Sequence, residues 1–69
     1  MEMIHVDSSN VEAVGYDENS STLQVEFKNG GMYQYFDVPE EVFFGLRDAD
    51  SVGGYLAARI KGTYRYSKV

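Results

Sequence analysis

The last third of the chain interleaves basic and aromatic residues in a way that suits a negatively charged, planar ligand. Cationic side chains attract phosphates and aromatic rings stack on bases, and proteins combine the two to hold single-stranded nucleic acids. The alternative is a solvated tail whose cations balance an acidic body. The full set is Tyr55, Arg59, Lys61, Tyr64, Arg65, Tyr66 and Lys68. The candidate RNA-binding residues among them are Arg59, Lys61, Tyr64, Arg65, Tyr66 and Lys68.

The charges are distributed unevenly, which restricts where a phosphate chain can bind. The net charge is −5, from 6 Lys and Arg against 11 Asp and Glu. Residues 1–50 hold all 11 acids and only Lys28 and Arg47 as bases, a balance of −9, whereas residues 51–69 hold four bases and no acid. Only the C-terminal segment is therefore expected to attract phosphate, and the acidic remainder favours a protein partner.

Three aromatic residues outside that segment are also candidates for contact with a partner. Tyr33 and Tyr35 flank Gln34 on a predicted strand, where paired aromatics can stack bases as they do on RNA-recognition sheets. We favour a place at the edge of the core, because tyrosine rings are readily buried there with the hydroxyl in water. Phe44 falls nearly opposite the apolar stripe of a predicted helix, so we expect an exposed ring that belongs to a partner or dimer surface.

His5, Asp7 and Ser8 have the residue types of a hydrolytic triad but not its arrangement. A working triad places the histidine between the other two residues on a rigid scaffold beside an oxyanion hole, which one N-terminal segment does not easily provide. One His and no Cys leave only scattered carboxylates as metal ligands. We therefore predict no catalytic residues, no metal and no cofactor.

The segment Ser51-Val52-Gly53-Gly54 can be interpreted in two ways. Bare backbone amides at a helix start can bind phosphate. The segment lacks the Gly-x-x-x-x-Gly-Lys pattern of a phosphate-binding loop. We therefore favour an ordinary serine N-cap followed by glycines that allow close packing.

A β-hairpin is the clearest element that would position these residues. Leu23, Val25 and Phe27 alternate with polar residues, which predicts a strand with one buried face. A three-residue turn with Gly30 in the left-handed conformation would place Tyr33 opposite Val25 and Tyr35 opposite Leu23. A two-residue turn would place Tyr33 opposite Glu26 instead, so we favour the first register because it gathers the apolar residues on one face.

The remaining pattern predicts two short helices and a last strand. A helix begins after Pro39, with Asp37 and Glu40 as a capping box, and its apolar stripe is Val42, Leu46 and Ala49 with Phe43 on the flank. A second helix, capped by Asp50 or Ser51 and ended by Gly62, buries Val52, Leu56 and Ile60. Strands are expected at residues 11–17, 23–27, 32–36 and 63–66.

Composition and order of elements define the class. With 43% apolar and 14% aromatic residues, the chain has enough apolar surface to fold, and its 69 residues suffice for a single domain, 1–69. We expect an α+β fold, a three- or four-stranded antiparallel meander packed against two short helices. The absence of Cys, of a signal peptide and of a membrane-length apolar run indicates the cytoplasm.

The chain resembles the KTSC family, a short domain found at the C-terminus of some lysyl-tRNA synthetases and alone in small bacterial and phage proteins. The matching segments, in order, are Ser8-Ser9-Asn10, Gly15-Tyr16-Asp17, Leu23-x-Val25-x-Phe27, Tyr33-Gln34-Tyr35, Val38-Pro39, Leu46…Ala49-x-Ser51-x-Gly53 and Ile60-Lys61-Gly62-x-Tyr64. The resemblance implies no established activity, and the link of the family to a tRNA enzyme suggests RNA as a ligand.

These observations favour a non-enzymatic binding module. A protein-interaction or accessory role is our first interpretation, and weak RNA binding through the basic, aromatic C-terminal third is the alternative. We expect a monomer or weak homodimer that has no association with membranes.

Overall fold

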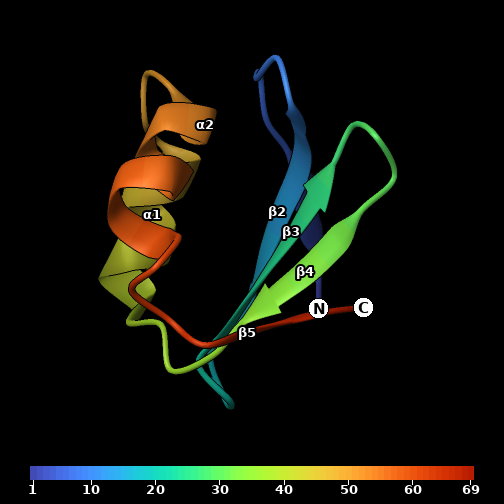
Figure 1. Ribbon diagram of the computed structural model, residues 1–69. Helices are drawn as coiled ribbons and strands as arrows, with labels where there is room; N and C mark the ends of the chain where they lie inside the picture. Colours follow the sequence, from blue (N-terminus) through green and yellow to red (C-terminus); the bar gives the residue numbers. More distant parts are fainter.

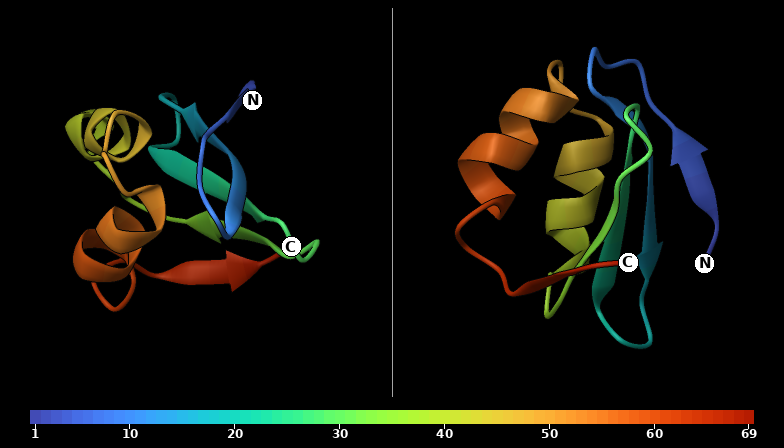
Figure 2. Two further views of the ribbon diagram at one scale, coloured as in Figure 1. Left: turned by 90° about the horizontal axis from the view of Figure 1, so that it is seen from above. Right: turned by 45° about the vertical axis from the view of Figure 1, so that its right-hand side comes forward.

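The computed structural model describes all 69 residues and shows one antiparallel sheet with both helices on the same face (Figures 1 and 2). The elements are β1 (Met3–His5), β2 (Val11–Asp17), β3 (Thr22–Phe27), β4 (Met32–Tyr35), α1 (Glu40–Arg47), α2 (Val52–Tyr55), η1 (Leu56–Ile60) and β5 (Tyr66–Lys68). The strands lie in the order β1-β2-β3-β4-β5, so each pairs with its neighbour in the chain. The predicted α+β meander with two helices is confirmed.

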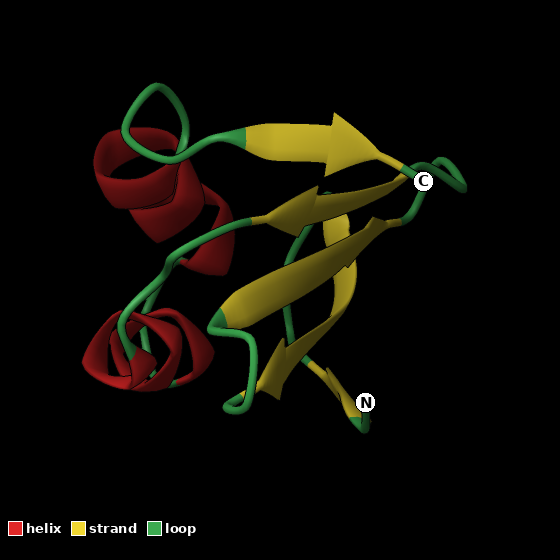
Figure 3. Cartoon of the chain, turned by 90° about the horizontal axis from the view of Figure 1, so that it is seen from below, coloured by secondary structure: helices red, strands yellow, loops and turns green.

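The sheet has five strands because Met3–His5 forms β1 at the edge beside β2, a strand that we did not predict. Ile4 and His5 are exposed. Because β1 is short and its side chains are largely exposed, it carries no apolar alternation from which to predict it. β5 occupies the opposite edge, beside β4 (Figure 3).

The β3–β4 hairpin has the predicted register. Tyr33 pairs with Val25 and Tyr35 with Leu23. The amide of Gly30 donates to the carbonyl of Phe27 at 2.9 Å, and Gly30 has a φ of +96°, which glycine adopts without steric cost. This register places Phe27, Tyr33 and Tyr35 on the face of the sheet that carries the helices.

The core fills the space between that face and the helices. Its buried side chains come from the sheet, from the linker residue Val38 and from both helices. They are Val11, Val14, Leu23, Val25, Tyr35, Val38, Phe43, Leu46, Val52, Leu56 and Ile60. As predicted, the second helix buries Val52, Leu56 and Ile60 and is capped by Ser51, whose hydroxyl accepts from the amide of Gly54 at 3.1 Å.

Two local predictions are wrong. Asp37 forms no capping box: it has a φ of +58°, the N-cap residue is Pro39 with no side-chain cap, and the Asp37 carboxylate accepts from Arg65 at 2.7 Å. The last strand begins at Tyr66 and not at Thr63. The amides of Thr63 and Tyr64 bond to the carbonyl of Ile60 at 3.1 and 3.3 Å, so these residues close the helix end before the chain extends.

None of the helices has both the length and the apolar character needed to cross a membrane.

Candidate ligand-binding groove

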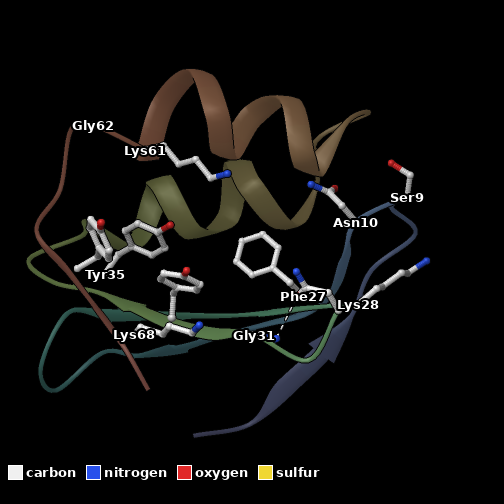
Figure 4. A pocket seen from close by; sticks show the side chains of 12 residues that line it. Ser9, Asn10, Phe27, Lys28, Gly31, Tyr35, Lys61, Gly62 and Lys68 are labelled. Atoms are coloured by element: carbon white, nitrogen blue, oxygen red, sulfur yellow. Dashed lines mark hydrogen bonds between the residues drawn. The ribbon is translucent and has the colours of Figure 1, made fainter.

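A groove of about 1010 Å³ lies between the end of the second helix and the part of the sheet formed by β3, β4 and β5 (Figure 4). Its walls are the β3–β4 hairpin, β5, the end of η1 and the turn before β2. Four aromatic rings line it, those of Phe27, Tyr33, Tyr35 and Tyr66. Three cations line it, Lys28, Lys61 and Lys68. No carboxylate is among the lining residues.

The aromatic rings form a continuous surface from the floor of the groove to its rim. Phe27 and Tyr33 meet edge to face at a centroid distance of 5.6 Å, and Tyr66 lies 5.8 Å from both Tyr33 and Tyr35. Tyr35 is 3% exposed, whereas Tyr66 is 62% exposed. Burial raises the pKa of the Tyr35 phenol, and negative charge on Tyr33 or Tyr66 would raise that pKa further. The rim ring is therefore available for stacking while the floor ring belongs to the core.

The backbone places the three lysines around these rings. In η1 the amide of Lys61 donates to the carbonyl of Leu56 at 2.9 Å, a π-type bond that ends the helix, and π turns are frequent at functional sites. The Lys61 ammonium lies 5.6 Å from the centroid of Phe27. Lys28 follows Phe27 in the hairpin, and Lys68 pairs with Tyr33 across β4 and β5. Figure 4 shows the Lys61 side chain reaching back over the groove.

None of the three lysines takes part in an ion pair, whereas two of the three arginines do. The ion pairs of the structure that involve an arginine or a lysine are Arg47 with Asp48 and Arg65 with Asp37. All three lysines of the chain line the groove, and all three arginines, namely Arg47, Arg59 and Arg65, lie outside it.

The structure brings together some of the predicted residues and separates others. Lys61, Tyr66 and Lys68 meet in the groove with Tyr33 and Tyr35. Arg59, Tyr64 and Arg65 do not line it. The Arg59 guanidinium lies over Tyr55 at 5.8 Å, that of Arg65 lies over Phe36 at 5.8 Å, and Tyr64 packs half-buried against the core.

Sequence reasoning missed Phe27 and Lys28 as parts of the site. Phe27 was expected as a buried residue of the hairpin, but it is only partly buried because the helices do not cover the hairpin end. Lys28 is one of only two bases in the acidic residues 1–50, so the charge distribution did not indicate it as part of a site. The sequence did not indicate that β5 pairs with β4, and this pairing places Lys68 and Tyr66 beside Tyr33 and Tyr35 of the hairpin.

A second exposed aromatic surface surrounds Phe44 on α1, which we call the Phe44 face. As predicted, Phe44 is more exposed than its neighbour, at 42% against 6% for Phe43. The Arg47 guanidinium lies 4.9 Å from the centroid of Phe44 and makes two 2.9 Å bonds to the Asp48 carboxylate. The hydrogen bond from Arg47 lowers the pKa of Asp48. A shallow hollow beside Phe44 is rimmed by Asp17, Glu18 and Glu40.

The N-terminal polar residues do not converge on a reaction centre. His5 Nδ1 lies 2.9 Å from Glu12 Oε2, and Ser8 Oγ accepts from the backbone amides of Asn10 and Val11 at 3.4 and 3.3 Å. No group of three or more His, Asp or Glu side chains is placed to hold a metal ion.

Comparison with known proteins accounts for nearly the whole chain. Residues 7–69 match the KTSC domain. The chain belongs to the KTSC domain family. The crystal structure of a KTSC domain protein from Yersinia pestis superposes with a TM-score of 0.95 at 32% identity, covering 99% of this chain and 96% of that one.

Sequence relatives are of two kinds. An uncharacterised protein of Stutzerimonas stutzeri is 37% identical over 100% of this chain and 99% of its own length. A lysine–tRNA ligase of a Nostoc species is 34% identical over 97% of this chain, which corresponds to 12% of the enzyme. The KTSC unit thus occurs in proteins of its own size and in a small part of a large enzyme.

Proposed function

We propose that this KTSC domain is a binding module that holds single-stranded RNA in the lysine-lined groove. The observation that carries the proposal is the composition of the groove: three lysines without ion-pair partners around four aromatic rings, and no carboxylate. Charge attraction combined with a stacking surface is the usual way in which proteins hold single strands.

The location of the acids supports RNA over the protein partner that net charge favours. A net charge of −5 disfavours binding of a polyanion. However, no acid lines the groove, and two of the acids elsewhere are paired with arginines, Asp37 with Arg65 and Asp48 with Arg47. The charged residues that line the groove are all cations, so the groove has a local charge of opposite sign to the net charge of the chain.

The aromatic surface of the groove favours a single strand over a duplex. Tyr66 presents an exposed ring on β5, and Tyr33 and Phe27 continue the aromatic surface inward. Bases in a duplex are stacked on each other, so their faces are not available to such a surface, whereas the unstacked bases of single strands are.

The relatives give independent support. Lysine–tRNA ligases are named for a reaction on tRNA, and those of the Nostoc species and of Trichormus variabilis each match this chain over 12% of their length. A small domain attached to an enzyme that acts on RNA gains from contributing to RNA binding.

The chain offers a matched experiment, because it has three lysines in the groove and three arginines outside it. Anisotropy of a labelled, mixed-sequence single-stranded RNA is measured for the wild type, for Lys28→Gln/Lys61→Gln/Lys68→Gln and for Arg47→Gln/Arg59→Gln/Arg65→Gln. Both variants lose the same charge. At about 1 kcal/mol per phosphate contact, the lysine variant should bind roughly 100-fold more weakly, and the arginine variant should stay within about threefold of the wild type.

Salt dependence provides a second measure of the same contacts. Three contacts with a single strand predict that log K falls by about 2 per tenfold increase in salt. Absence of wild-type binding at about 50 mM salt would reject RNA binding. Equal weakening in the two triple variants would show that net charge, and not the groove, controls affinity.

The Phe44 face is a second candidate surface, for a protein or for another copy of the chain. Its support is that the exposed side chains of Phe44 and Met1 line one hollow that is rimmed by acids, since contiguous exposed apolar surface with a polar rim marks interaction sites. Light scattering over a concentration series tests the homodimer: self-association should be present in the wild type and lost in Phe44→Ser. A monomer in both proteins would remove the homodimer.

A further inference from the structure

The end of the groove farthest from Tyr35 is polar, and two asparagines form it. Asn10 precedes β2 and Asn29 lies in the β3–β4 turn. The amide of Lys28 donates to the carbonyl of Asn10 at 2.9 Å, which holds the turn before β2 against the hairpin. Each side-chain amide has one donor group and one acceptor atom, and internal hydrogen bonds decide which of them is free.

Internal hydrogen bonds hold the side chain of Asn10 so that its amide oxygen is bonded within the protein and its amide nitrogen is not. Ser8 Oγ accepts from two backbone amides, so its own hydrogen is free to donate, and it does so to Asn10 Oδ1 at 3.0 Å. Gly53 makes room for this arrangement, because a Cβ there would lie 2.7 Å from Asn10 Oδ1. The amide nitrogen is left without a partner, and Figure 4 shows it on the side of the residue that faces Lys61.

Asn29 is fixed in the same sense. Its Oδ1 accepts from the backbone amide of Gly31 at 3.0 Å, so the oxygen is used within the turn. Its amide nitrogen is the group left for a ligand. The polar end of the groove therefore offers two amide donors, while each amide oxygen already accepts one internal hydrogen bond.

We propose that the groove selects pyrimidine bases that present a carbonyl oxygen at ring position 4, and thus uracil over cytosine. This inference rests on the proposed RNA-binding function. Uracil and cytosine have the same size and stack alike, but at ring position 4 uracil carries a carbonyl acceptor and cytosine an amino donor. A site whose free side-chain amides are donors gains a hydrogen bond from uracil and meets an unpaired donor in cytosine.

The test compares oligouridylate with oligocytidylate of about ten nucleotides. The wild type should bind oligouridylate about fivefold more tightly, which corresponds to one hydrogen bond. In Asn10→Asp the oxygen that accepts from Ser8 is kept and the amide donor becomes an acceptor. Its preference should therefore disappear or reverse. The added negative charge weakens both RNAs alike, so the ratio of the two affinities is the readout.

Asn19→Asp is the matched control, because it adds the same charge in the exposed turn between β2 and β3. Its ratio should equal that of the wild type. Thermal denaturation verifies that Asn10→Asp is folded, and Asn29→Asp, which keeps the oxygen that accepts from Gly31, provides a second position if it is not.

The outcomes separate the two proposals. If neither RNA binds the wild type, the proposed function itself fails. If both bind equally, RNA binding stands and selection of uracil is wrong. If the preference persists in both Asn10→Asp and Asn29→Asp, the two amide donors do not read the base and the inference is overturned.

Discussion

The groove and the Phe44 face share a local geometry and differ in charge. In the groove the Lys61 ammonium lies 5.6 Å from the centroid of Phe27, and on the Phe44 face the Arg47 guanidinium lies 4.9 Å from the centroid of Phe44. Arg47 is held by two hydrogen bonds to Asp48. Lys61 has no ion-pair partner.

This difference shows that a cation over an aromatic ring does not by itself mark an anion site. A guanidinium matches the geometry of a carboxylate and is readily neutralised by one, whereas an ammonium on a flexible stem is less constrained. The two surfaces therefore suit different partners. The groove suits a polyanion with planar groups, and the Phe44 face suits an apolar or cationic protein surface.

The largest expected effect is the difference in stability between loss of the buried ring of α1, Phe43, and loss of the exposed ring, Phe44. Phe43 stacks on Tyr16 at 5.2 Å, and its removal in Phe43→Ala should lower the free energy of unfolding by about 3–4 kcal/mol. Phe44→Ala should cost less than about 1 kcal/mol because its ring is largely in water. Urea denaturation of both variants measures the difference. Similar losses would show that Phe44 supports the fold and is not a surface for partners.

The next effect compares the exposed rings of the two surfaces as stacking platforms. Tyr66→Ala should weaken RNA binding by about 30-fold, because one base-stacking contact contributes about 2 kcal/mol. Tyr66→Phe should bind nearly as the wild type does, since the ring and not the hydroxyl stacks. Phe44→Ala is the control and should leave the affinity unchanged. RNA anisotropy that fell equally in Tyr66→Ala and Phe44→Ala would contradict the separation of the two surfaces.

A smaller effect compares the two cations that lie over rings. Lys61→Met removes the charge and keeps the length of the side chain, and it should weaken RNA binding about fivefold, as expected for one phosphate contact. Arg47→Met should stay within about twofold, because its charge is already bound by Asp48. Titrations at about 50 mM salt measure both. An Arg47→Met variant as weak as Lys61→Met would refute the distinction between free and paired cations.

The parts of the fold that were predicted correctly are those in which local pattern and burial agree. Alternation of Leu23, Val25 and Phe27, together with the glycine turn, fixed the hairpin register, and helical spacing distinguished Phe43 from Phe44. The capping box failed because the Asp37 carboxylate pairs with Arg65, 28 positions away in the chain. Such a partner cannot be found from spacing alone.

The site was only half predictable for a related reason. The sequence indicated Lys61, Tyr66 and Lys68 because they are close together in the chain. It could not indicate Asn10 or Lys28, since their contribution depends on the pairing of β5 with β4 and on the packing of the turn before β2 against the hairpin. These contacts join backbone groups, which every residue carries, so the side chains give no signal of them.

The smallest expected effect is a difference in how much folding stability is lost at alkaline pH when the groove or the Phe44 face is altered. Burial raises the pKa of Tyr35 at the floor of the groove, whereas a tyrosine in the unfolded chain ionises near pH 10. Below that pH both states are neutral and the stability is unaffected. Above it the unfolded state loses its proton first, so stability falls until the folded group also ionises. Tyr35→Phe cannot ionise and should lose less stability between about pH 8 and pH 11, as measured by urea midpoints. Phe44→Ala keeps Tyr35 and should show the full wild-type loss, so equal losses in all three proteins would contradict this assignment to the floor of the groove.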